Sequence, residues 1–145
     1  SWTDFFISER MKPQLKLAKD AGKLGSPTIS HFESMYTELP DIFPDEPPSL
    51  LHGDLWGGNY FFDEHGQPTI YDPAVYYGHR EIELAFTHLF GGFPGSFYSA
   101  YEDSYPLSSG FSTRKDIYNL YPLLVHTNLF GGSYARQVKG IVKQF

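Results

Sequence analysis

Three polar residues in the middle of the chain have the types and the spacing that phosphoryl transfer requires. Asp54 follows an apolar pair and a glycine, Asn59 follows Asp54 with four residues between them, and Asp72 comes 13 positions after Asn59. Phosphoryl transfer from ATP needs a carboxylate that orients the attacking hydroxyl and accepts its proton, together with oxygen ligands for Mg²⁺. Carboxylate and side-chain amide oxygens are the hard ligands that suit Mg²⁺.

The segments between these residues are expected to bring them together. Residues 60–62 and 69–71 are short β-prone runs, and DEHGQP between them contains Gly66 and predicts a hairpin turn. A hairpin returns its second strand beside its first, so Asp72 should lie close to Asn59. Asp and Asn are also common turn residues, and each of the three taken alone is explained by a turn. Their spacing, combined with the apolar lead-in, favours a site.

The rest of the chain predicts helices, because apolar residues recur at spacings of three and four. These helices are expected at residues 2–21, 27–39, 79–90, 97–105, 112–130 and 134–142. Ser112 or Thr113 should cap the fifth of them, Leu129 should face inward, and Pro122 should kink it or mark its start. Four prolines in residues 40–49 predict an irregular connector. The predicted fold class is therefore mainly α with a small β-hairpin.

Composition excludes several classes of function. The chain has 145 residues, enough for one domain with its own core, and carries 17 acidic against 11 basic residues. That balance argues against nucleic acid as a partner, because phosphate contacts need clustered Lys and Arg. The absence of cysteine excludes disulfides and Cys-based zinc sites. No apolar run reaches 18 residues and no signal peptide is visible, so we expect a soluble, cytoplasmic protein without a membrane partner. The oligomeric state is not predicted.

Four stretches resemble the fructosamine kinase (ketosamine-3-kinase) family. They are LLHGDLWGGNYFF, IYDPAVYYGHREIELAF, LFGGFPGSFYSAYEDSYPL and YNLYPLLVHTNLFGGSY. The similarity runs from about Trp2 to the end and is densest over residues 51–93. HGD-LW-x-GN followed by YDPA and YGHRE is more specific than a general kinase pattern. The family belongs to the aminoglycoside-phosphotransferase-like branch of the protein-kinase-like fold, so the resemblance implies the C-terminal, helical lobe of such a fold.

The resemblance also implies roles for individual residues. Asp54 would be the catalytic base, Asn59 and Asp72 the Mg²⁺ ligands, and His52 a support for the loop that carries the base. Trp56 is a candidate platform for the sugar, although a core or lid aromatic explains it equally well. The implied reaction is ATP-dependent phosphorylation of a ketosamine (fructosamine or ribulosamine) at the sugar 3-hydroxyl, in protein deglycation. The substrate would be a small-molecule or protein-linked glycated amine.

Residues 79–85 contain acids that should support the site. Arg80 or Glu81 is expected to pair locally and to brace the loop around Asp54. Glu83, in the sequence ELA, sits where related phosphotransferases carry Asp-Leu-Ala, so the acid is kept with one more methylene.

The parts that grasp ATP in kinases are missing from the sequence. Neither a Gly-rich loop nor a strand Lys paired with a helix Glu precedes Asp54. Family members are about twice as long, so we expect residues 1–145 to be a single domain, the catalytic C-terminal lobe without the N-terminal ATP-grasping lobe, and inactive alone. Two alternatives stay open: a non-catalytic kinase-like binding module, and a metal-dependent hydrolase using His52, Asp54, Asp72 and His79.

Overall fold

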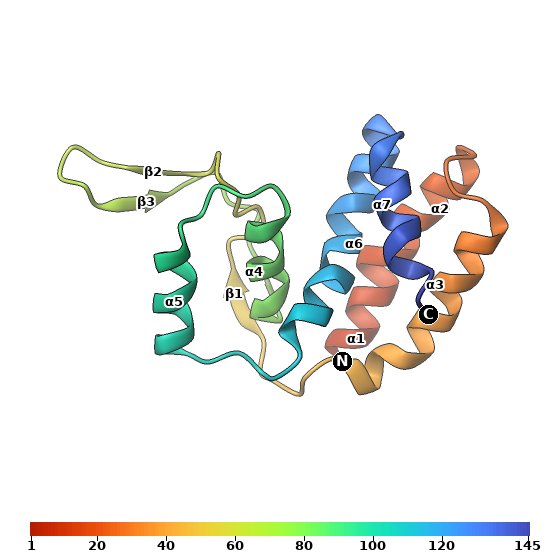
Figure 1. Ribbon diagram of the computed structural model, residues 1–145, viewed down its shortest axis with the longest axis horizontal. Helices are drawn as coiled ribbons and strands as arrows, with labels where there is room; N and C mark the ends of the chain where they lie inside the picture. Colours follow the sequence, from red (N-terminus) through yellow and green to blue (C-terminus); the bar gives the residue numbers. More distant parts are fainter. The chain divides into compact units, whose positions relative to one another are not determined.

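The computed structural model describes residues 1–145 and divides them into two compact units (Figure 1). Ser1–Asp45 and Asn119–Phe145 form the first unit, and Glu46–Tyr118 forms the second. In chain order the elements are α1 (Trp2–Phe5), η1 (Phe6–Met11), α2 (Lys12–Asp20), α3 (Ser26–Ile42), β1 (Ser49–Leu51), β2 (Tyr60–Phe62), β3 (Pro68–Ile70), β4 (Tyr76–Gly78), α4 (Arg80–Leu89), α5 (Gly95–Ser104), α6 (Phe111–Phe130) and α7 (Ser133–Val142). None of the helices combines the length and apolar character that crossing a bilayer requires.

The first helical run of the first unit changes its geometry just before Pro13. Residues of η1 form a π-helix, and the Lys12 N–H donates to the carbonyl of Ile7, five residues earlier. Proline has no N–H, and its ring clashes with the carbonyl four residues before it in a regular α-helix. A wider turn ahead of the proline accommodates both effects. The helix predicted over residues 2–21 is confirmed, with this change of geometry ahead of Pro13.

The core of the first unit is built from amphipathic helices. Buried residues recur along α3 at helical spacing, and α7 contacts α3 with a buried face of its own. These positions are Thr28, Phe32, Met35 and Leu39 on α3, and Ala135, Val138 and Val142 on α7. Phe6, from η1, is fully buried and meets the Phe43 ring edge-on at 5.4 Å.

The connector predicted for residues 40–49 starts later than expected. Helix α3 includes Pro40 and ends at Ile42. Pro40 lies in the last turn, where its missing N–H removes only one hydrogen bond, and the buried Leu39 and Phe43 on either side hold the turn in place. Tertiary burial therefore outweighs the local signal of the proline.

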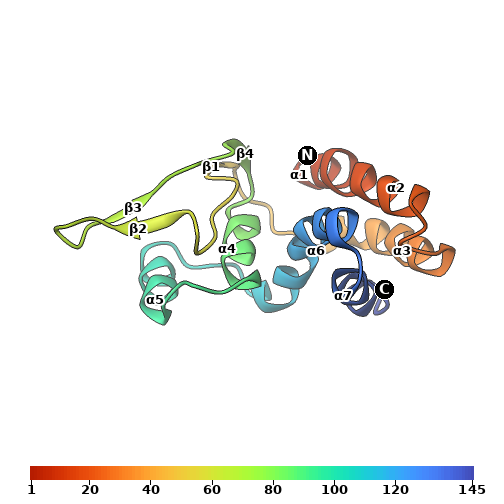
Figure 2. The same cartoon turned by 90° about the horizontal axis from the view of Figure 1, so that it is seen from above.

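The second unit contains two small antiparallel sheets, β1 with β4 and β2 with β3. The β2–β3 hairpin confirms the sequence prediction, with its second strand one residue earlier than expected. In Figures 1 and 2 this hairpin extends away from α4 and α5 of the same unit. The β1–β4 sheet was not predicted, because its strands pair across 25 or more residues and no short turn joins them to signal a hairpin. Leu51 is buried while Leu50 is exposed, as alternation along a strand requires.

Two expectations for α6 are wrong. The helix begins at Phe111, and the carbonyl of Gly110 accepts the N–H groups of Thr113 and Arg114, so neither Ser112 nor Thr113 is the cap. Leu129 is 66% exposed rather than inward-facing, because it lies in the last turn, beyond the buried stretch of the helix.

Candidate functional site

The loop of residues 52–59 joins β1 to β2 and carries both Asp54 and Asn59. The Asn59 side chain is buried, and its Nδ2 donates to the main-chain carbonyl of Asp54 at 2.9 Å and to Asp54 Oδ2 at 3.0 Å. Both N–H bonds of the amide are therefore used within the loop, and no hydrogen bond engages Asn59 Oδ1. The four-residue spacing noted in the sequence folds into a turn in which the amide orients the carboxylate.

The β2–β3 hairpin brings Asp72 to the end of this loop. The Tyr71 N–H donates to the carbonyl of Asn59 at 3.1 Å, which extends the ladder by one pair, and Asp72 is the next residue. The expected return of the hairpin beside Asn59 is confirmed at the level of the backbone. Asp72 is exposed, and it is the one non-glycine residue with a positive φ, +55°. Strained backbone of this kind concentrates at functional sites.

His52 connects the segment of Asp54 to the segment of Asp72. Its Nδ1 accepts from the Asp54 N–H at 3.3 Å, and its Nε2 lies 2.9 Å from the carbonyl of Tyr71, which can only accept. Together these contacts require a neutral imidazole with its proton on Nε2. The His52 carbonyl also accepts from the Ala74 N–H at 2.8 Å. All of these contacts fit the structural role that the sequence suggested for this residue.

Glu83, in the first turn of α4, anchors the start of the loop. Its carboxylate accepts the N–H of His52 at 2.7 Å and the N–H of Gly53 at 2.8 Å. Burial raises the pKa of Glu83, although the two amides act in the opposite direction. Gly53 has φ +84°, and a Cβ there would lie 2.0 Å from the carbonyl oxygen of Ala74. The turn therefore accepts only glycine at position 53.

Aromatic side chains fix the other end of the loop. The Tyr71 hydroxyl donates to the carbonyl of Gly58 at 2.6 Å. The Trp56 ring covers Gly58, because a Cβ at Gly58 would lie 2.3 Å from the ring. Trp56 is nevertheless 42% exposed. It presents an accessible indole, supported from behind by the loop backbone.

The loop also packs closely on the segment that follows α4. The Tyr60 hydroxyl donates to the carbonyl of Gly92 at 2.6 Å. A Cβ on Gly92, whose φ is +103°, would come within 3.1 Å of Gly57 Cα. Two glycine backbones thus meet where side chains would hold them apart.

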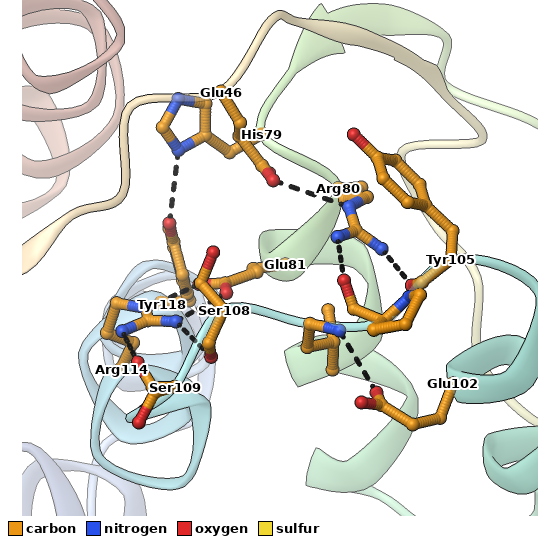
Figure 3. A network of polar contacts seen from close by, with 12 residues as sticks. Glu46, His79, Arg80, Glu81, Glu102, Tyr105, Ser108, Ser109, Arg114 and Tyr118 are labelled. Atoms are coloured by element: carbon orange, nitrogen blue, oxygen red, sulfur yellow. Dashed lines mark hydrogen bonds and ion pairs between the residues drawn. The ribbon is translucent and has the colours of Figure 1, made fainter.

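Glu81 and Arg80 lie elsewhere in the second unit (Figure 3). The fully buried Glu81 accepts from Arg114 Nε at 2.7 Å and from Nη2 at 2.6 Å, and Arg114 also donates to the carbonyls of Ser108 and Ser109. The hydrogen bond with Glu81 raises the pKa of Arg114. These contacts hold the loop between α5 and α6.

Arg80 acts on the same loop. Its guanidinium donates to the carbonyl of Tyr105 at 2.6 Å and to that of Pro106 at 2.7 Å, and it lies 3.4 Å from Glu46. Neither Arg80 nor Glu81 contacts the 52–59 loop through these bonds. Glu83 is the acid that braces it.

The four residues of the hydrolase alternative do not form a metal site. No group of three or more His, Asp or Glu side chains in residues 1–145 is placed to hold a metal ion. His79 is buried with its Nδ1 3.4 Å from the Tyr118 hydroxyl, and both nitrogens of His52 face backbone groups. The geometry gives this alternative no support.

Sequence reasoning missed two contributors to the site and did not identify the partners of a third, Glu83. Tyr60 and Tyr71 were counted only as strand residues, since a hydroxyl that reaches across a loop leaves no local pattern. Glu83 was singled out through the family resemblance alone, and nothing in its spacing identified its partners. The helical repeat could have placed Glu83 and Glu81 on nearly opposite faces of α4, because each residue adds about 100° of rotation and the two are two positions apart.

The architecture is that of the C-terminal, helical lobe of a kinase-like fold, and comparison with known proteins identifies the family. The family model for fructosamine kinase matches residues 1–145. The chain belongs to the fructosamine kinase family.

Individual relatives agree with this assignment. A probable ketoamine kinase of Synechocystis sp. is 44% identical over 99% of this chain and 48% of its own length. The ketosamine-3-kinase of Mus musculus is 42% identical over 92% of this chain and 43% of its own length. A crystal structure of a Thermobifida fusca protein assigned as a fructosamine-3-kinase superimposes with a TM-score of 0.90 at 34% identity, over 99% of this chain and 50% of that one. The chain spans about half the length of the relatives it matches.

Proposed function

We propose that this chain carries the catalytic half of an ATP-dependent ketosamine kinase, with Asp54 as the base. The observation that supports this most directly is the pair of hydrogen bonds from Asn59 Nδ2 to Asp54. They fix the carboxylate that must meet the substrate hydroxyl, and they leave Asn59 Oδ1 without a hydrogen bond, while the Asn59 backbone pairs with Tyr71, the residue before Asp72. Ketosamine as the substrate class rests on the names of the relatives.

The donor set fits Mg²⁺. Asn59 Oδ1 and the Asp72 carboxylate make no hydrogen bond or ion pair within the chain, and both are oxygen ligands of the kind that Mg²⁺ prefers. Asn59 and Asp72 would hold the ion, which would neutralise charge on the phosphates of ATP when bound.

The residues of the loop then have distinct tasks in the transfer. Asp54 orients the 3-hydroxyl of the sugar and accepts its proton, while the hydroxyl oxygen forms a bond to the γ-phosphorus and the bond to the β–γ bridging oxygen breaks. The products are the sugar 3-phosphate and ADP. His52 and Glu83 keep the loop in position, and neither needs to touch the substrate.

Trp56 is suited to contact the sugar. Its ring is exposed, lies two residues beyond the base and is held against Gly58. An aromatic face packs well on the C–H-rich face of a sugar or on the aliphatic part of an amine. We assign the ring to substrate binding.

The 145 residues alone are not expected to phosphorylate a ketosamine. Several apolar side chains of the β2–β3 hairpin are exposed: Phe61 at 49%, Phe62 at 60% and Ile70 at 59%. Exposed apolar surface of this kind usually has a partner. By strand alternation, Phe62 and Ile70 share one face of the hairpin and Phe61 lies on the other. In the proposed complete enzyme, an ATP-grasping lobe packs against the hairpin, and the sequence before Asp54 contains none of that lobe's phosphate-binding features.

The test measures ADP release from Mg-ATP by the complete gene product, with lysine glycated by ribose or by glucose as the acceptor. We expect sugar-dependent turnover that falls at least about 10²-fold in Asp54→Asn, which keeps the size and polarity of the side chain. Turnover that Asp54→Asn leaves unchanged would refute Asp54 as the base. No turnover with any ketosamine would refute the substrate class and favour a non-catalytic binding module.

A further inference from the structure

A pocket of about 450 Å³ lies in the second unit and has no part in the site described above. It is formed by α4, α5, the loop after α5 and the first residue of α6, and none of its lining residues belongs to the 52–59 loop or to the β2–β3 hairpin. Its volume falls within the range of about 300–1,000 Å³ that is common for small-molecule sites. It therefore has room for a ligand of its own.

Aromatic rings form much of the wall. His88 stacks on Tyr98, with the centroids 4.0 Å apart and the planes at 15°, and Phe111 lies 6.4 Å from His88. The Tyr98 hydroxyl is 3.0 Å from Thr87 Oγ1, so that ring is fixed to α4. Partial burial, and then the charge of Lys115, lower the pKa of His88.

Carboxylates of α5 give the pocket a negative charge. Glu102 and Asp103 both line it. Glu102 Oε2 accepts the Leu107 N–H at 3.1 Å, which holds that side chain in place, and the Asp103 carboxylate makes no hydrogen bond. Lys115 is the opposing cation, near enough to His88 to affect it. The Arg80 guanidinium near Tyr101 is already paired with Glu46, so two carboxylates against one unpaired ammonium leave a net negative charge beside the aromatic rings.

We propose that this pocket binds a primary alkylammonium group of about the size of a lysine side chain. The rings would pack on the methylenes and face the cation, which aromatic faces attract, and Asp103 would supply the unpaired charge. Arg80 already lies over the Tyr101 ring in this way, with its guanidinium carbon 5.6 Å from the centroid. An anion would meet two carboxylates, and a neutral ligand would leave the excess negative charge unbalanced. The proposal goes beyond phosphoryl transfer and does not depend on Asp54.

The test is a titration of the ¹⁵N-labelled 145-residue protein, followed by NMR, with Nα-acetyl-lysine N-methylamide as the probe. The neutral control is the same molecule acetylated on Nε. We expect saturable shifts confined to α4, α5 and the start of α6 with the cationic probe, and none of them with the neutral one at equal concentration. Equal shifts with both probes, or shifts that map elsewhere, would overturn the proposal.

Charge variants give a second test, because the two substitutions should change the affinity in opposite directions. Asp103→Asn should weaken binding about two- to fivefold, the effect of one exposed ion pair, and Lys115→Gln should strengthen it by a similar factor. Neither side chain makes a hydrogen bond that folding needs. Asp54→Asn should bind the probe like the wild type, so the failure of the proposed kinase activity would leave this result unaffected. Unchanged affinity in Asp103→Asn, or weaker binding in Lys115→Gln, contradicts the assignment.

Discussion

Asn59 holds Asp54 at two points, through hydrogen bonds of 2.9 Å to its main-chain carbonyl and 3.0 Å to its carboxylate. A single side-chain amide therefore sets both the path of the loop and the direction of the carboxylate. The arrangement also determines which atom of Asn59 stays available, because both of its N–H bonds are used.

Asn59→Ala should lower the free energy of unfolding by about 1–3 kcal/mol, since the carbonyl of Asp54 loses its partner inside a closed turn. Asn59→Asp keeps the size but places a second carboxylate within about 3 Å of Asp54, where like charges repel. We expect the stability loss of Asn59→Asp relative to wild type to be smaller at pH 4 than at pH 7. Urea unfolding followed by circular dichroism measures both effects. Wild-type stability of Asn59→Ala would mean that the two hydrogen bonds do not hold the loop.

Two glycines with similar backbone angles offer a matched pair of substitutions. Gly53 has φ +84° and Gly66 has φ +74°, but only a Cβ at Gly53 meets another atom, the carbonyl oxygen of Ala74 at 2.0 Å. Gly66→Ala should cost about 1–2 kcal/mol, the price of a left-handed residue. Gly53→Ala should cost more than about 3 kcal/mol or prevent folding. Thermal unfolding of both variants separates the cost of the left-handed backbone from the cost of the contact with Ala74. Equal losses of stability in the two variants would refute the close approach of Gly53 to the carbonyl of Ala74.

The local geometry around Asp54 was easier to predict from the sequence than the distant contacts that support it. The spacing of Asp54 and Asn59 and the hairpin before Asp72 are local features, and local features can be recognised in one sequence. The partner of Glu83 is 30 or 31 residues away, and the partner of Glu81 is 33 away. The spacing of residues along a helix does not show which of its acidic side chains will accept from a given backbone N–H elsewhere in the chain.

The errors in the predicted elements also come from tertiary contacts that a local pattern does not show. Pro40 and Leu129 were judged from their own type and spacing, whereas burial of the neighbouring Leu39 and exposure of the last turn of α6 decided their places. The strands β1 and β4 are as short as β2 and β3, but no hairpin turn joins them. Their pairing depends on contact between segments 25 or more residues apart, from Leu51 with Tyr76 to Ser49 with Gly78.

Glu83 should make stability depend on pH in a defined direction. Burial raises its pKa above the ordinary 4.5, so the folded state binds the proton more tightly than the unfolded state does. By linkage, this group's contribution to stability falls as the pH rises from about 4.5 through the folded pKa, and the penalty is complete above it. The stability of wild type relative to Glu83→Gln should therefore increase when the pH is lowered from 7 toward 4.5. Urea titrations at several pH values measure this difference, with the exposed Glu38→Gln as control. A difference that shrinks on acidification would contradict the direction.

Gly58→Ala should displace the Trp56 ring, because the added Cβ would lie 2.3 Å from it. The neighbouring Gly57→Ala is the control, since its Cβ has no contact shorter than 3.4 Å. In a Trp2→Phe background, Trp56 is the sole indole, and its fluorescence reports the change. We expect a shifted emission maximum and stronger acrylamide quenching for Gly58→Ala, with little change for Gly57→Ala. Identical spectra for the two variants would show that the indole does not rest on Gly58.

Substituting only one partner of the buried Glu81–Arg114 ion pair should strongly lower the stability of the fold. Glu81 is fully buried and Arg114 is 6% exposed, and they share two hydrogen bonds of 2.6 and 2.7 Å. Glu81→Gln leaves the guanidinium buried without its counter-charge, which typically costs about 3–5 kcal/mol. Lys16→Gln, which breaks the exposed pair of Lys16 and Asp20, should cost less than about 1 kcal/mol.

The double substitution Glu81→Leu with Arg114→Met distinguishes a charge effect from a loss of packing at the Glu81–Arg114 pair. Removing both charges leaves neither uncompensated, so the double variant should be more stable than Glu81→Leu alone, even though the carbonyls of Ser108 and Ser109 lose their donors. Guanidinium chloride unfolding of the two single variants and the double variant completes the cycle. If the losses of the single variants simply add, the ion pair is not coupled, and the cost lies in the hydrogen bonds to the loop between α5 and α6.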